Sequence, residues 1–155
     1  MSNEDRLTAS GLVLPTPAIP IANYVPAVRC GSLLLISGQL AFAADGKLHP
    51  EHKGKLGLDV SDEAGFAAAR LCGLNVLAQA RIFLGSLNKI VRCIRLGGFI
   101  NSSPDYERHA AIMNGASDLM VEILGDAGCH ARTTIGVAQL PLSSAVEVEA
   151  MFEVH

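Results

Sequence analysis

Residues 145–154, next to the C-terminus, constrain the fold of this chain most strongly, because apolar and polar side chains alternate along them. One side of the segment 145–154 consists of Val146, Val148, Ala150, Phe152 and Val154. The other side consists of Glu147, Glu149, Met151 and Glu153. Successive side chains of a β-strand point to opposite faces of the sheet, so this pattern predicts a strand with one buried face.

Other segments supply the remaining strands and the layer that covers them. The predicted strands are residues 33–36 (with an extension to 42), 89–100 and 133–140. The predicted helices are residues 62–84 and a second region from the Ser103-Pro104 cap to Leu124. Ser61 suits a helix start, and Gly85 suits a helix end. This order predicts an α+β fold, in which two helices pack on one face of the sheet.

The length of 155 residues predicts a single domain, 1–155, in which residues 1–20 form an extended N-terminal segment. Four prolines between residues 14 and 26 argue against a helix there. Half of the residues are hydrophobic and 17% are charged, so identical subunits are expected to cover part of the apolar surface. The net charge of -3 and the scattered basic residues speak against DNA as a partner and disfavour RNA.

The cysteines and the N-terminus indicate a cytoplasmic protein. The four cysteines are widely spaced and contain no C-x-x-C pair, which is typical of reduced thiols. Cys72 and Cys93 lie on predicted core elements, so we expect both to be buried. The polar start MSNEDRLTASG is unlike a signal peptide, and no apolar run reaches the roughly 20 residues of a membrane helix.

Common catalytic signatures are absent, and the residues alone leave the site open. The sequence contains no G-x-S-x-G, H-E-x-x-H or phosphate-binding glycine loop. His49 and His52 could share a metal, but nothing nearby completes a ligand set, so we expect no metal. Arg132 is either a carboxylate-binding fork or a surface arginine. Glu147 is either a site residue or part of a solvated strand face.

Two stretches resemble the Rid family of reactive intermediate deaminases, also called YjgF-like or L-PSP endoribonuclease-like. They are residues 22–39, ANYVPAVRCGSLLLISGQ, and residues 132–150, RTTIGVAQLPLSSAVEVEA. The second is similar to the family's closing pattern of arginine, short strand, leucine-proline turn and alternating valine and glutamate. The resemblance implies a mixed sheet like that of bacillary-type chorismate mutase and a homotrimer with sites at the subunit clefts. It also implies hydrolysis of 2-imino or enamine acids to 2-keto acids and ammonia.

The resemblance further implies a role for individual residues. Arg132 would hold the substrate carboxylate, and Glu147 would orient or activate the attacking water. Tyr24 and Ser37 would line the pocket, and Asn114 matches a pocket asparagine. We expect the leucine-proline turn to place Arg132 and Glu147 on adjacent strands, in a cleft that a neighbouring subunit completes.

Thr134 is a departure from this pattern, because deaminating members often carry a cysteine two positions after the arginine. This difference marks a divergent branch of the family. Thr134 nevertheless lies where substrate or water would be contacted. Imine hydrolysis needs an anchored carboxylate, a positioned water and a proton carrier, and therefore no metal or organic cofactor. The alternatives are a non-catalytic trimer that binds small carboxylates and an endoribonuclease, as attached to some family members.

Overall fold

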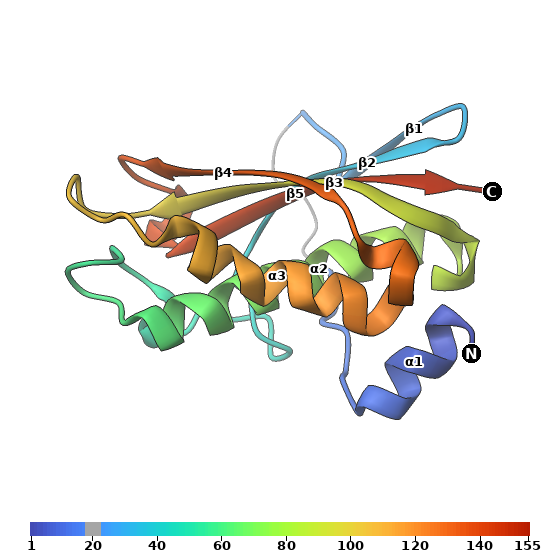
Figure 1. Cartoon of the computed structure of the whole chain (residues 1–155), viewed down its shortest axis with the longest axis horizontal. Coiled ribbons are helices and arrows are strands. Elements are labelled where there is room, and N and C mark those ends of the chain that lie inside the picture. Colours follow the sequence, from blue (N-terminus) through green and yellow to red (C-terminus); the bar gives the residue numbers. More distant parts are fainter. Residues whose placement is uncertain (18–22) are drawn as a thin grey trace.

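The mixed sheet has five strands in the order β1-β2-β5-β3-β4, and two long helices lie along one of its faces (Figure 1). The computed structural model describes residues 1–17 and 23–155. The strands are β1 Ala27–Cys30, β2 Leu33–Leu40, β3 Ile90–Asn101, β4 Ala131–Val137 and β5 Val146–Val154. The α-helices are α1 Asn3–Ser10, α2 Asp62–Leu84 and α3 His109–Leu124. The short 3-10 helices are η1 Pro50–His52, η2 Leu87–Lys89, η3 Gly125–Gly128 and η4 Pro141–Ser143.

The alternating C-terminal segment forms the central strand, which confirms the prediction. β5 pairs antiparallel with β2 on one side and with β3 on the other. Its apolar residues face the helices, and Phe152 is fully buried. The opposite face of the sheet carries the glutamates of β5 together with Leu33 and Leu35 of β2, and no helix of the described chain covers it (Figure 1).

The two long helices pack closely against each other beneath the sheet. A Cβ added at Gly115 of α3 would lie 2.1 Å from the carbonyl oxygen of Phe66 on α2, so glycine permits this close approach. α2 has the predicted bounds and contains buried Cys72, while Cys93 is buried on β3. By length and composition α2 could span a bilayer, but 67% of its most apolar window is buried in the core.

The second helix begins later than predicted, because the segment after β3 is held as a loop. Ser103 does not cap the helix, whose N-cap is Arg108, and the Ser103 N–H donates to the Leu56 carbonyl. The Tyr106 hydroxyl and the Arg108 guanidinium both donate to the Asp62 carboxylate, at 2.9 and 2.6 Å. The helix starts at His109 only after these contacts. It then crosses from β3 to the parallel strand β4, which starts two residues earlier than predicted.

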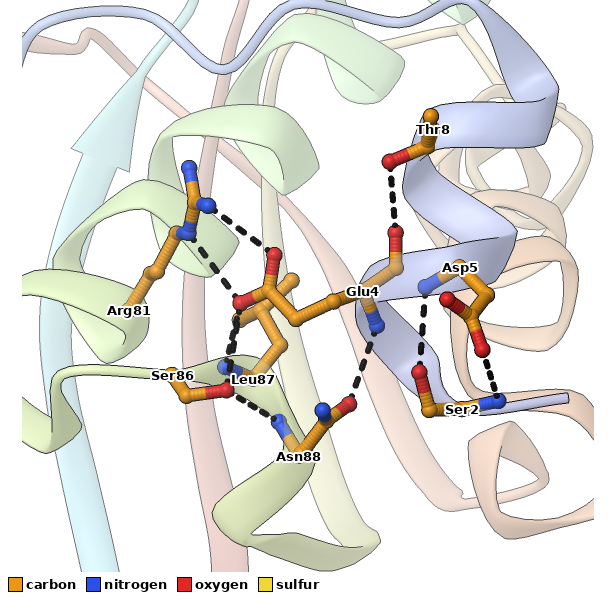
Figure 2. Close-up of polar contacts among 8 residues, drawn as sticks. All are labelled: Ser2, Glu4, Asp5, Thr8, Arg81, Ser86, Leu87 and Asn88. Carbon is orange, nitrogen blue, oxygen red and sulfur yellow. Dashed lines mark hydrogen bonds and ion pairs between the residues drawn. The ribbon is translucent and has the colours of Figure 1, made fainter.

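The expected extended N-terminal segment is wrong for residues 3–10, which form the helix α1. Ser2 and Asp5 close a capping box at its start. Figure 2 shows Glu4 reaching the end of α2, where its carboxylate accepts hydrogen bonds from the Leu87 N–H at 2.8 Å and from Arg81 at 3.1 Å. Only Leu7 is buried, so the apolar pattern of α1 is too weak to predict it. The expectation for residues 18–20 lies outside the described residues.

We expect Glu4→Gln to destabilise the protein by about 1–2 kcal/mol, because charge-assisted bonds to Leu87 and Arg81 become weaker. The partial exposure of Glu4 limits this effect. The melting temperature should fall by roughly 2–8 °C in a thermal scan at neutral pH. Glu107→Gln, at an exposed loop residue, serves as the control. Equal melting temperatures of the two variants would contradict the role of Glu4 in fixing α1.

Candidate active site

Arg132, near the start of the edge strand β4, reaches across to α3. Its Nη1 donates to the Asn114 Oδ1 at 2.8 Å and to the Ser117 Oγ at 3.1 Å. Its Nη2 donates to the Ala110 carbonyl at 3.3 Å. A guanidinium has five N–H donors, so the Nε–H and one Nη2–H remain without an acceptor in the described part of the chain. Such a pair can bind a carboxylate with two parallel hydrogen bonds.

A second hydrogen-bond chain fixes Ser117, on which Arg132 rests. The His130 Nδ1 lies 2.6 Å from the Gly128 carbonyl oxygen, so we assign the ring proton to Nδ1. In the neutral ring, Nε2 then accepts from the Ser117 hydroxyl at 3.0 Å. Ser117 and His130 are site residues that the sequence did not predict. Their contact crosses from α3 to the residue before β4, and no local spacing indicates it.

Thr134 lies two residues beyond Arg132 on β4 and therefore faces the same way. Its Oγ1 is buried and has no hydrogen-bond partner within residues 1–17 and 23–155. A buried hydroxyl without a hydrogen-bond partner lowers the stability of the fold by about 1–3 kcal/mol. The Thr134 hydroxyl is therefore available to donate to, or accept from, a bound molecule. We call Arg132, Thr134, Asn114 and Ser117 the arginine half-site.

Glu147 lies on the uncovered face of the sheet, over the Ser37-Gly38-Gln39 stretch of β2. A Cβ added at Gly38 would lie 2.1 Å from the Glu147 Oε1, so the carboxylate rests directly on this backbone. The Ser37 hydroxyl donates to the Val25 carbonyl at 2.8 Å. Tyr24, the residue before Val25, is 56% exposed. We call Glu147, Gly38, Ser37 and Tyr24 the glutamate half-site.

Burial is the main cause that raises the pKa of Glu147 above its ordinary value, and the nearby charge of Glu149 raises it further. A carboxyl group whose pKa is higher in the folded chain than in the unfolded chain stabilises the folded state when it is protonated. Its contribution to stability is complete at a pH below the unfolded pKa. This contribution is lost as the pH rises through the folded pKa. We therefore expect Glu147→Gln to raise the melting temperature at pH 7 and to change it little at pH 4. Thermal scans across this range measure the difference, and an equal shift at both pH values would contradict the raised pKa.

The expectation that Arg132 and Glu147 lie close together on adjacent strands is wrong within one chain. β3 separates the two strands, and Arg132 is in register with its Leu96, whereas Glu147 is in register with its Phe99. Leu96 faces the helices and Phe99 the uncovered face, so the two side chains lie on opposite sides of the sheet. The cause is the crossover through α3, which places β4 beside β3 and parallel to it. The chain then passes through η4 and crosses to the other side of β3, where it forms β5.

The two histidines considered for a metal do not gather ligands. The His49 Nε2 contacts the Asp45 carboxylate at 2.9 Å, and the buried His52 Nδ1 has no hydrogen-bond partner in the described chain. Among the described residues, no group of three histidine, cysteine or acidic side chains could hold a metal ion.

Comparison with known proteins places this geometry in a family. Residues 4–154 match the sequence profile described as "YjgF/chorismate_mutase-like, putative endoribonuclease". The curated protein TCP17 of Trypanosoma cruzi is 42% identical over 151 residues, which cover 97% of this chain and 92% of TCP17. The chain therefore belongs to the YjgF/chorismate mutase-like family.

Solved structures agree with this assignment. The crystal structure of a "putative endoribonuclease" from Shewanella oneidensis is 38% identical, with a TM-score of 0.94, and the match covers 99% of this chain and 100% of the other. E. coli TdcF with bound serine is 25% identical, with a TM-score of 0.62, and the match covers 92% of this chain and 94% of TdcF. The mixed sheet and its two covering helices are thus the fold of the family.

Proposed function

We propose that this protein hydrolyses reactive 2-imino or enamine acids to 2-keto acids and ammonia in the cytoplasm. The reaction would take place where the arginine half-site of one copy meets the glutamate half-site of another. The observation that carries this proposal is that Arg132 keeps a carboxylate-binding pair of N–H donors while it is held on α3 by three hydrogen bonds. A preorganised guanidinium of this kind binds a small carboxylate with little loss of side-chain freedom.

Glu147 suits the proton transfers of the reaction. A raised pKa brings a carboxylate closer to the operating pH, where it can accept and return a proton. The substrate reacts as the protonated imine. Water attacks its carbon, the electron pair of the C=N double bond moves to the nitrogen, and Glu147 takes a proton from the water. Glu147 then returns this proton to the nitrogen of the resulting carbinolamine, the C–N bond breaks as the C=O bond forms, ammonia leaves and the hydroxyl proton passes to water. An enamine first takes up a proton at carbon to give the imine.

The positions of the half-sites favour a ring of identical subunits. They lie on opposite faces of the sheet, so a contact between copies must join two different surfaces. A contact of this type closes into a ring, of which a trimer is a small example, whereas a two-fold dimer uses the same surface twice. The uncovered face also exposes Leu33 and Leu35, which a neighbouring copy would remove from water.

The relative that holds serine supports a ligand of this size and charge, since serine carries a carboxylate next to an amino-bearing carbon. Thr134 favours a second candidate, a trimer that binds small carboxylates without turnover, because a threonine replaces the cysteine frequent in deaminating relatives. The endoribonuclease description of the family is a third candidate. The net charge of -3 and the scattered basic residues do not favour an RNA-binding surface.

The test is the disappearance of a 2-imino acid that a pyridoxal-phosphate dehydratase releases from serine or threonine. The protein should accelerate loss of the imine, and Glu147→Gln should slow turnover while carboxylate binding stays largely intact. Carboxylate binding without acceleration would favour the second candidate. RNA degradation that persists after stringent repurification would favour the third.

A further inference from the structure

A cavity of about 360 Å³ lies at the carboxyl ends of β3 and β4. Its walls include Ser102, Ser103 and Tyr106 from the loop after β3, His109 from the start of α3, and Gly136 from β4. The volume falls within the range of ordinary small-molecule pockets. None of these five residues belongs to the arginine or the glutamate half-site.

A polar pair forms one wall of this cavity. The Ser102 Oγ lies 3.1 Å from the His109 Nε2. A Cβ added at Gly136 would lie 2.5 Å from the His109 Nε2 and 2.7 Å from the Ser102 Oγ, so the pair rests on the bare backbone of β4. The His109 ring packs edge-on against Tyr106 at a centroid distance of 5.2 Å, and Asp62 holds the Tyr106 hydroxyl. The serine and the histidine are therefore fixed in place.

The cavity is aligned with the arginine half-site. Arg132, Thr134 and Gly136 alternate along β4 and face the same side, over a length of about 13 Å between the first and the last Cα. The Arg132 side chain runs toward the start of α3, because its Nη2 donates to the carbonyl of Ala110, the residue after His109. The guanidinium, the unpartnered Thr134 hydroxyl and the Ser102–His109 pair thus follow one another along β4 and α3.

We infer that this cavity receives the far end of the substrate whose carboxylate Arg132 holds, and that it selects 2-imino acids ending in an amide or a hydroxyl. This inference rests on the proposed function. Ser102 and His109 offer a hydrogen-bond donor and an acceptor, which match an uncharged polar group.

Three carboxylates that differ in end group or in length test the inference in isothermal titration calorimetry with the full-length protein. Glutaramate ends in an amide, 5-methylhexanoate replaces that amide by an isopropyl group of the same shape, and butyrate is too short to reach the cavity. Glutaramate should bind about tenfold more tightly than 5-methylhexanoate, the effect of one or two neutral hydrogen bonds. An isopropyl end that binds equally well or better would overturn the inference.

Variants separate this inference from the proposed function. Ser102→Ala should abolish the preference for glutaramate and leave the dissociation constant of butyrate unchanged. His109→Ala should do the same from the other side of the pair, should Ser102→Ala fold poorly. Arg132→Ala should weaken all three ligands. Binding that depends on Arg132 but shows no effect of either cavity variant would overturn this inference alone. Binding that ignores Arg132, or no binding by any ligand, would overturn the proposed function as well.

Discussion

Replacing Arg132 with alanine should weaken the capture of a carboxylate ligand by about tenfold to a hundredfold, because charge-assisted hydrogen bonds contribute about 1.5–3 kcal/mol. The β4 backbone pairs with β3 through main-chain groups, so the strand should persist without the side chain. Asn114 and Ser117 lose only a hydrogen-bond partner near the surface. The measurements are the dissociation constant of 2-ketobutyrate and the rate of imine disappearance.

Two further variants show whether the fork or only the charge matters at this position. Arg132→Lys should restore part of the affinity, because lysine keeps the charge but cannot donate two parallel hydrogen bonds. Arg6→Ala removes a half-buried arginine outside the site, which donates to the Met1 carbonyl, and should leave binding unchanged. If a well-folded Arg132→Ala assembly removes imine at the normal rate, the proposed deaminase site is wrong.

Replacing Phe152 with alanine should lower the free energy of unfolding by about 3–5 kcal/mol. Phe152 is fully buried at the centre of the sheet, where β5 pairs with both β2 and β3. The loss combines the transfer free energy of the ring with the cavity that it leaves. Denaturant unfolding at a fixed protein concentration measures the change, since association between copies also affects the midpoint.

Glu153→Ala is the matched control, because Glu153 is the next residue and faces the opposite side of the same strand. It should cost less than about 1 kcal/mol. Similar losses for the two variants would contradict the one-sided burial of β5.

The elements with strong periodic patterns could be predicted from the sequence, since a single amphipathic pattern fixes each one. β5 and α2 are the clearest examples: the buried face of β5 and the bounds of α2 agree with the structure. The start of α3 could not be predicted, because Asp62, distant in sequence, holds Tyr106 and Arg108 in a loop. α1 buries only Leu7, so its sequence carries a capping box but little periodicity.

The site was only partly predictable, for a topological reason. The resemblance to the Rid family indicated Arg132, Glu147, Tyr24 and Ser37, and the structure places Glu147 against Gly38, the residue after Ser37. Asn114 contacts Arg132 as a pocket partner would. The separation of Arg132 from Glu147 follows from the strand order, which no local pattern encodes. The support of Ser117 by His130 depends on a contact that forms only after α3 packs beside β4.

Mixing two inactive variants tests most directly whether one site draws on two copies of the chain. Arg132→Ala and Glu147→Gln chains, combined in equal amounts by co-expression or by joint refolding, assemble at random. In a ring where each site takes Arg132 from one copy and Glu147 from the next, about a quarter of the sites are intact. Imine disappearance should then recover to about a quarter of the wild-type rate. A rate no higher than that of the separate variants, or a wild-type protein that does not accelerate the reaction, would contradict the account.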